Sequence, residues 1–335
     1  MQAASIIEFD FEWRPLHNYL KAQGIAPPAL PQVAGEGTPQ LPSETLYDWM
    51  VLNSRDATDG LRLGEHYRIS DYGVAGLALL SAECVDDALK VVKTYMLLFN
   101  KDIAEIRIEQ STPDEVRIAI GLNSRPGWSE QARLFHANVL ASASFKLFKD
   151  LLRDDFELLA LTLPANPGDV RPYQEYFRQP VRFRGSGIVF HLPAQLLKTP
   201  IPTANPAVFQ TALALAGESF NDLLEREMGG LKQRVVALLD SLPERYPDIR
   251  WTAQHLKMTE RTLRRRLAEE NCSYREIIDQ ARQARAQRLL ANAQLSIEQI
   301  GALLGYADSS SFRHAFRRWT GQSANLYRQR HSGKP

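Results

Sequence analysis

Two stretches near the C-terminal end repeat one pattern, which limits what this part of the chain can fold into. Each has a short helical segment, a tight turn, a polar residue and a second helix with two large apolar residues four positions apart. The stretches are 253–267 and 300–316, and their polar residues, Thr259 and Asp308, suit helix N-caps. Because side chains four positions apart share one helix face, each apolar pair must point inward. These pairs are Leu263 with Leu267, and Phe312 with Phe316.

Inward packing of the apolar pairs leaves a polar, arginine-rich face on each second helix. Such a helix behind a tight turn suits a recognition helix in the major groove of DNA, since arginine can bond guanine bidentately or bind phosphate. We expect residues in the first turns to read bases and residues further along to hold phosphate. The expected base readers are Arg261, Arg265, Ser310 and His314, the expected phosphate ligands are Arg317 and Arg318, and Arg264 and Arg313 complete the set of DNA contacts. For either helix taken alone, a solvated basic surface is the alternative.

The segment between the repeats predicts a rigid spacer. Ser273 with Glu276, and Ser296 with Gln299, form the Ser-x-x-Glu/Gln pattern of a capping box at a helix start. The first box begins a helix of about 18 residues that reaches Ala291 and is about 27 Å long. A rod of this size can hold two recognition helices about one DNA turn apart, roughly 34 Å, so that they enter successive major grooves.

Charge is distributed unevenly along the 335 residues. Residues 230–335 contain 19 basic and 10 acidic residues, a net charge of +9, whereas residues 1–229 carry −8. A polyanionic partner is therefore expected for the C-terminal part only. We expect an effector-binding and dimerisation domain at 1–228 and a DNA-binding domain at 229–335, with Gly229-Gly230 as the hinge. The alternative is a kink within one continuous helix between the domains.

Further residues of the C-terminal part match one known family. They are Leu263-Arg-Arg-Arg-Leu267, Arg282, Ala286, Leu289-Leu290, Ile297, Ile300, Gly305-Tyr306, Ser311-Phe312, Phe316-Arg-Arg-Trp319, Gly321 and Tyr327-Arg328. Through these residues, positions 250–330 resemble the DNA-binding domain of AraC/XylS-type transcription regulators. The resemblance implies two helix-turn-helix motifs and sequence-specific DNA binding. Departures at Asn271, Gly301 and Ala324 concern local helix stability rather than DNA contacts, and Asn271 tolerates the left-handed conformation of a helix end.

The sequence patterns of the larger N-terminal part predict an α+β domain. Strand patterns stop at residue 231, so the part that follows is expected to be all-α. Alternation of apolar and polar residues predicts a hairpin from strands 103–109 and 115–121. The other expected strands are 156–163, 181–183 and 188–191, the last two joined by a hairpin turn at Gly185-Ser-Gly187. The expected helices are 13–23, 43–53, 85–99, 127–153, 170–177 and 205–228.

Several N-terminal segments carry a second resemblance. They are 60–65, 71–76, 88–89, 176–183 and 196–203, and they resemble the arabinose-binding-like effector domain of one AraC-type branch. The resemblance implies a module that senses an effector and dimerises, without implying a sugar ligand. An apolar pocket with few polar groups is the usual form of such a site. Its candidate lining residues are Tyr72, Tyr95, Phe135 and His136, for which an ordinary core aromatic or a surface histidine is the alternative.

Motifs for catalysis, metals or cofactors are lacking, so we expect no enzyme, no metal site and no cofactor. No GxGxxG, P-loop, GxSxG, HExxH or zinc-ligand spacing occurs, and the seven histidines are scattered. A secretory signal is not visible, and the longest apolar run, 73–80, is too short to span a bilayer, which predicts a cytoplasmic location without membrane contact. The expected partners are duplex DNA, an unidentified small-molecule effector, RNA polymerase and a second copy of the chain. The rival hypotheses are an enzyme fused to a DNA-binding domain and a DNA-binding dimer without an effector.

Overall fold

The computed structural model describes residues 10–25, 49–54, 58–100, 103–123, 128–153, 156–164, 168–183, 185, 187–227, 230–240, 242, 246–291 and 295–331. The chain divides into two compact units, residues 1–216 and 217–335. The division falls inside helix α9 (Pro206–Glu227), whereas the sequence placed it after residue 228. Gly229 lies outside the described residues. The hinge at Gly229-Gly230 therefore stays a prediction.

A five-stranded sheet organises the N-terminal unit, with strand order β1-β2-β5-β3-β4. The strands are β1 (Ile103–Gln110), β2 (Glu115–Leu122), β3 (Ala160–Leu163), β4 (Val181–Phe183) and β5 (Gly187–Pro193). The pairs β1–β2, β2–β5 and β3–β5 are antiparallel, and β3–β4 is parallel. The expected hairpin of β1 and β2 is thus confirmed. The expected strand 156–163 is shorter than predicted, because only Ala160–Leu163 joins the sheet.

The predicted hairpin turn at Gly185-Ser-Gly187 is wrong. Strands β4 and β5 are not neighbours, because β3 lies between them and pairs with both. Helix α8 (Arg171–Phe177) connects β3 to β4, and a parallel pair requires such a crossover rather than a tight turn. A strand–helix–strand order was present in the sequence, but the two short strands flanking the glycines suggested direct pairing.

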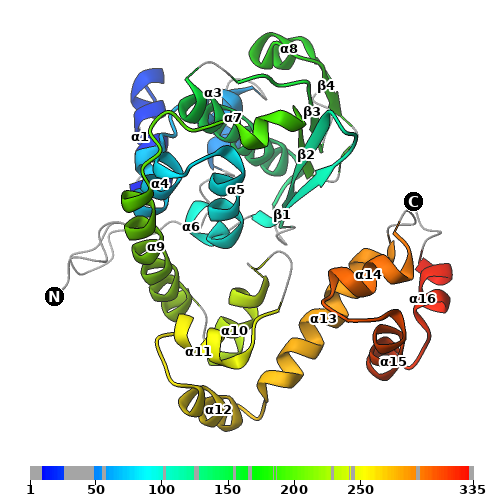
Figure 1. Ribbon diagram of the computed structural model, residues 1–335. Helices are drawn as coiled ribbons and strands as arrows, with labels where there is room; N and C mark the ends of the chain where they lie inside the picture. Colours follow the sequence, from blue (N-terminus) through cyan, green and yellow to red (C-terminus); the bar gives the residue numbers. More distant parts are fainter. Residues whose placement is uncertain are drawn as a thin grey trace. The chain divides into compact units, whose positions relative to one another are not determined.

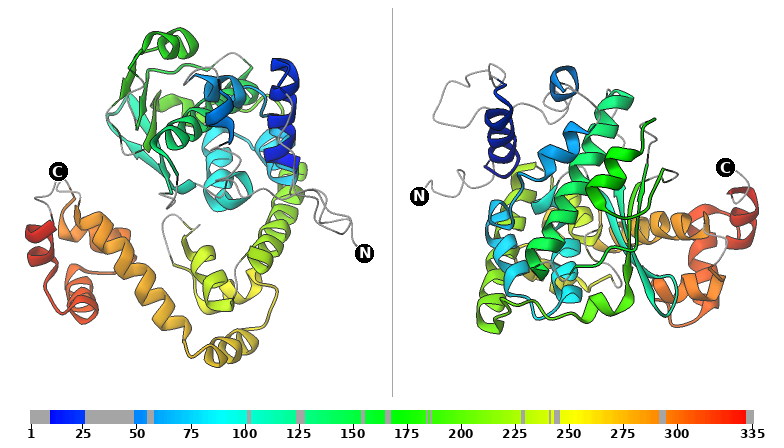
Figure 2. Two further views of the ribbon diagram at one scale, coloured as in Figure 1. Left: turned by 180° about the vertical axis from the view of Figure 1, so that it is seen from behind. Right: turned by 90° about the horizontal axis from the view of Figure 1, so that it is seen from above.

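Helices cover one face of the sheet (Figures 1 and 2). Along β2, Val116, Ile118 and Ile120 are buried while Arg117 is exposed, the alternation of a strand with one covered face. The helices of this unit that are described in full include α1 (Asp10–Gln23), α3 (Asp59–Gly64), α4 (Gly73–Ser81), α5 (Val85–Thr94), α6 (Met96–Phe99), α7 (Glu130–Leu152), α8 and the start of α9, with short 3₁₀ segments at Ile69–Tyr72 and Ala194–Lys198. Residues 49–53 are also helical. The predicted helix 85–99 is interrupted at Tyr95, which separates α5 from α6. Of the predicted helix 43–53, residues 43–48 lie outside the described residues.

The described residues of the C-terminal unit form helices joined by turns and include no strand. After the end of α9 it contains α10 (Leu231–Asp240), α11 (Ile249–His255), α12 (Glu260–Glu269), α13 (Tyr274–Ala291), α14 (Ile297–Leu303), α15 (Ser309–Thr320) and α16 (Ala324–His331). Helix α13 is a rod with α10–α12 at one end and α14–α16 at the other (Figures 1 and 2). The predicted fold class, an α+β domain followed by an all-α domain, is confirmed. Among the described residues, no helix is both long and apolar enough to cross a bilayer.

Candidate nucleic-acid interface

The first helix-turn-helix consists of α11 and α12. Thr259 caps α12 as predicted, because its side-chain oxygen accepts a hydrogen bond from the backbone N–H of Thr262 at 3.1 Å. Leu263 and Leu267 have no measurable exposure. Their burial fixes the rotation of the helix, so the candidate contacts Arg261, Arg264 and Arg265 are all exposed, as is the neighbouring Arg266.

The second helix-turn-helix consists of α14 and α15. Asp308 caps α15 by accepting a hydrogen bond from the backbone N–H of Ser311 at 2.7 Å, and this bond lowers the pKa of the Asp308 carboxyl. Phe312 and Phe316 are fully buried among residues of α13, α14 and α16. The opposite face of α15 is exposed and carries Ser310, Arg313, His314, Arg317 and Arg318.

The two turns have the same hydrogen-bond pattern, which confirms the internal repeat. In the first turn, Lys257 N–H donates to the carbonyl three residues back and Met258 N–H donates to the carbonyl five residues back, and Gly305 and Tyr306 repeat both bonds in the second. Lys257 and Gly305 both have positive φ, +54° and +79°. Glycine adopts this conformation without strain, whereas lysine does so at a cost of about 1–2 kcal/mol. The left-handed residue is therefore set by the turn itself and not by local sequence preference.

The rod α13 ties the two motifs together. Ser273 and Glu276 form the predicted capping box, with reciprocal side-chain-to-backbone bonds of 2.8 and 3.3 Å. Asn271, just before the rod, has φ +55°, as expected for a helix end. Tyr274 at the start of the rod donates its hydroxyl to the carbonyl of Pro247 at 2.8 Å. The rod is thereby fixed to the segment that precedes α11.

Three of the candidate arginines bind carboxylates of the protein. Arg264 binds Glu260 at 2.8 Å and Arg265 binds Glu269 at 2.6 Å, each four positions away along α12. Arg318 of α15 binds Asp279 of the rod at 2.9 Å. All three side chains are more than half exposed, so DNA can compete for them with only a small loss of ion-pair energy.

The end of α12 also holds the helix that precedes the motif. Both carboxylate oxygens of Glu270 accept bonds from the first backbone N–H groups of α10, those of Leu231 and Lys232, at 2.7 and 2.9 Å. Further back, the Asn221 side chain of α9 donates to the carbonyl of His255 in α11. Residues before 229 thus contact the helix-turn-helix unit directly. A DNA-binding fragment that begins at residue 217 keeps these contacts, and one that begins at residue 229 loses that of Asn221.

Two family models match the chain. Residues 15–201 match the arabinose-binding domain of AraC transcription regulator, N-terminal, and residues 252–330 match a helix-turn-helix domain. The first match alone covers more than half of the chain. The chain belongs to the AraC family of transcription regulators. Both expected resemblances are confirmed.

Individual AraC-type relatives match over most of the chain. The HTH-type transcriptional regulator VqsM of Pseudomonas aeruginosa is 51% identical over 320 residues, which cover 96% of this chain and 97% of that protein. The ornithine utilization regulator of the same organism is 29% identical over 282 residues, covering 81% of this chain and 78% of that protein. The crystal structure of transcriptional regulator CdpR from P. aeruginosa shares 57% identity with a TM-score of 0.58 and covers 96% of this chain and 98% of its own. These relatives are transcription regulators and not enzymes.

The four candidate effector residues of the AraC-type N-terminal domain lie in packed surroundings. Phe135 is buried in an apolar cluster of α1, α3 and α7, and the buried His136 meets the ring of Trp128 edge-on at 4.9 Å. Tyr72 is half-buried and packs on Phe99, while Tyr95 packs on the main core, where burial raises the pKa of its hydroxyl. Tyr95 and Phe135 pack on different clusters, and Tyr72 packs on both, so the assignment of these four residues to an effector pocket stays a prediction.

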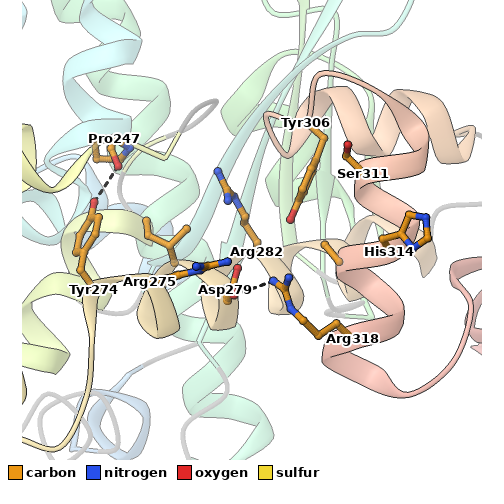
Figure 3. A pocket seen from close by; sticks show the side chains of 11 residues that line it. Pro247, Tyr274, Arg275, Asp279, Arg282, Tyr306, Ser311, His314 and Arg318 are labelled. Carbon is orange, nitrogen blue, oxygen red and sulfur yellow. Dashed lines mark hydrogen bonds and ion pairs between the residues drawn. The ribbon is translucent and has the colours of Figure 1, made fainter.

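Sequence reasoning missed the part of the AraC-type DNA-binding unit where the rod meets α15. Arg282 of α13 lies between two aromatic rings, 5.6 Å from Tyr246 and 5.3 Å from Tyr306. Together with Asp279 it lines a hollow that also contains residues of α15 (Figure 3). A signal existed, since Arg282 and Tyr306 both belong to the family pattern. Their meeting depends on tertiary packing, and the spacing along the chain does not reveal it.

Proposed function

We propose that this AraC-type regulator binds one face of duplex DNA with α12 and α15 in successive major grooves, and that its N-terminal unit controls this activity by dimerising and binding a small molecule. The observation that carries the proposal is the pair of motifs, with the same hydrogen-bond pattern in their turns, on one capped rod. Each motif presents an arginine-bearing face to solvent. A rod of 18 residues is about 27 Å long, which suits recognition helices in neighbouring grooves.

Selection of duplexes from fragmented genomic DNA by the full chain, followed by hydroxyl-radical footprinting, tests this function. We expect protection on one face of the duplex over two successive major grooves for each bound copy. Affinity should fall steeply with salt, with a log–log slope near −0.9 for each phosphate neutralised. Protection of a single groove, or an affinity that does not depend on salt concentration, contradicts the proposal.

The proposed base readers are Arg261, Arg265, Ser310 and His314, with Arg264 and Arg313 beside them. They lie in the first turns of their helices, nearest the groove floor. Arg317 and Arg318 lie further along α15 and are proposed to hold phosphate. The bond between Arg318 and Asp279 gives Arg318 a second role, since it also fixes α15 against the rod in the absence of DNA.

Control by a small molecule is supported by the match of the N-terminal unit to the arabinose-binding domain of the family. Among the candidate lining residues, Tyr72 and Tyr95 are the better placed, because they are only partly buried while Phe135 and His136 lie within the core. Thermal-shift screening of the full chain tests this point, since a ligand that binds only the folded state raises its stability. A DNA-binding dimer without an effector is the second candidate, and it predicts that no small molecule in the screen shifts the transition.

A homodimer doubles the number of recognition helices and suits paired sites on DNA. Sedimentation of the full chain at several concentrations tests this proposal, and a monomer at all concentrations and on DNA contradicts it. We further propose that the DNA-bound protein acts on RNA polymerase in the cytoplasm, because its relatives are transcription regulators. Transcription in vitro from a selected promoter, with and without the protein, tests that step.

A further inference from the structure

The rod and the second recognition helix enclose a hollow of about 610 Å³ in the C-terminal unit (Figure 3). Its floor is one face of α13, its far wall is α15 with Tyr306, and its near edge is the segment at Pro247. The rod residues recur at three- and four-residue spacing, so they share one helix face. They are Tyr274, Arg275, Ile278, Asp279 and Arg282.

Positive charge dominates this hollow. Three arginines, Arg275, Arg282 and Arg318, line it, against one carboxylate, that of Asp279. Arg318 occupies this carboxylate at 2.9 Å. Arg275 is exposed. Arg282 lies between the rings of Tyr246 and Tyr306, and its buried Nε makes no hydrogen bond to the residues that the structure describes. Because Arg318 and Asp279 neutralise each other, Arg275 and Arg282 give the hollow a net positive charge, which favours the binding of an anion.

The location of the hollow indicates which anion it receives. Its wall includes Ser311 and His314 of α15, and His314 is a proposed base reader. The hollow is therefore continuous with the surface that faces the second major groove. When α12 and α15 occupy successive major grooves, the intervening sugar-phosphate backbone must pass alongside the rod that joins them. A phosphate of that backbone is an anion that the exposed Arg275, near the start of the rod, can reach.

We propose that this hollow binds a backbone phosphate of the duplex between the two grooves, with Arg275 as the direct contact and Arg282 as a second, more buried positive charge. The inference rests on the proposed function, because it assumes that both recognition helices engage one duplex. It adds a contact on the rod, outside both helix-turn-helix motifs. This contact carries no base preference, since phosphate contacts position a protein without reading sequence.

Neutralising single phosphates tests the proposal directly. The full chain is titrated with a selected duplex in which one phosphate at a time is replaced by an uncharged methylphosphonate. We expect the natural protein to lose affinity, on the order of 3- to 10-fold, at one or two positions between the footprints of α12 and α15. At those positions alone, methylphosphonate substitution should no longer lower the affinity of Arg275→Gln. The log–log slope of its affinity against salt concentration should also be smaller in magnitude by about 0.9.

Arg288→Gln is the matched control, because Arg288 is an exposed arginine of the same rod that does not line the hollow. It should keep the natural pattern of sensitivity. The proposal is overturned if Arg275→Gln and the natural chain respond alike at every phosphate. It is also overturned if Arg275→Gln binds DNA normally and millimolar inorganic phosphate raises the melting temperature of the natural chain but not of this variant, since the hollow then serves a free anion. Failure of the proposed function is distinct, since in that case the natural chain prefers no duplex over random DNA.

Discussion

Arg265 of the first recognition helix provides the sharpest test of base reading. A bidentate arginine–guanine contact discriminates against a wrong base by about 1–3 kcal/mol, which corresponds to roughly 5- to 150-fold in affinity. In the free protein Arg265 binds Glu269 at 2.6 Å, but the two side chains are 63% and 57% exposed. An exposed pair four positions apart on a helix contributes only about 0.3–0.5 kcal/mol. Breaking the ion pair with Glu269 in order to bind a guanine therefore lowers DNA affinity by about a factor of two. The arginine–guanine contact keeps most of its free energy.

We expect Arg265→Ala to lose roughly 5- to 150-fold affinity for the selected duplex and to lose preference at one base pair. The unfolding free energy should fall by at most about 0.5 kcal/mol, because only the exposed pair with Glu269 is removed. Conversely, Glu269→Gln should raise DNA affinity by up to about twofold, since it frees Arg265 and removes a negative charge near the duplex. Fluorescence anisotropy on the selected duplex and on duplexes with single base changes measures both effects.

Arg266→Ala is the matched control in the same helix. Arg266 is also an exposed arginine, but it lines the hollow formed with Glu225, Gly230 and Glu270 at the junction with α10. Its removal should change affinity little and equally for all duplexes. If Arg265→Ala weakens every duplex by the same factor, Arg265 holds phosphate and the assignment of base readers to the first turns is refuted.

Three further outcomes follow from the geometry. Thr259→Ala should destabilise the C-terminal unit by about 1 kcal/mol in urea unfolding, while Thr259→Ser keeps the cap and most of the stability. Lys257→Gly should stabilise the unit by about 0.5–1 kcal/mol in the same assay, because relief of left-handed strain outweighs the greater chain entropy of glycine. A hydrogen bond from His191 lowers the pKa of the Glu115 carboxyl. The ionised carboxylate therefore stabilises the fold fully above the ordinary glutamate pKa, and this contribution is lost as pH falls through the lowered pKa. Melting temperatures between about pH 5 and pH 3 should thus fall less for Glu115→Gln than for the natural chain.

The C-terminal unit was the more predictable half, because its signals are local. Caps such as Thr259 and Asp308 act on backbone groups three residues away, and the buried pairs repeat with the helix period. The contacts that the sequence did not reveal join residues far apart in the chain. Arg318 and Asp279 are 39 positions apart and Tyr274 and Pro247 are 27, so only the packed structure brings them together. The roles assigned to the exposed arginines stay predictions, because exposure alone does not distinguish a base from a phosphate.

The N-terminal unit was harder to predict for the opposite reason. Its sheet joins strands whose order depends on contacts across the whole unit, and periodicity within β4 or β5 carries no information about their neighbours. The interruption at Tyr95 has a similar origin. Residues 85–99 have a continuous apolar face, and packing on the main core decides where the helix stops. Local sequence therefore predicted that these elements exist, and tertiary contacts set their limits and partners.

Two residues that carry the N-terminal family resemblance, Gly64 and Asp71, have structural roles, and such roles do not identify an effector. Gly64 lies where α3 crosses α7, and a side chain there would collide with Ser142 and with the carbonyl of Val139. Asp71 accepts the backbone N–H of Arg68 at 2.8 Å and so fixes the turn that leads into α4. Such residues preserve helix packing whatever ligand is bound. The proposed effector contact Tyr72 lies in one of these segments, so we expect the choice of effector to depend on this side chain and on others outside the segments, and not on Gly64 or Asp71.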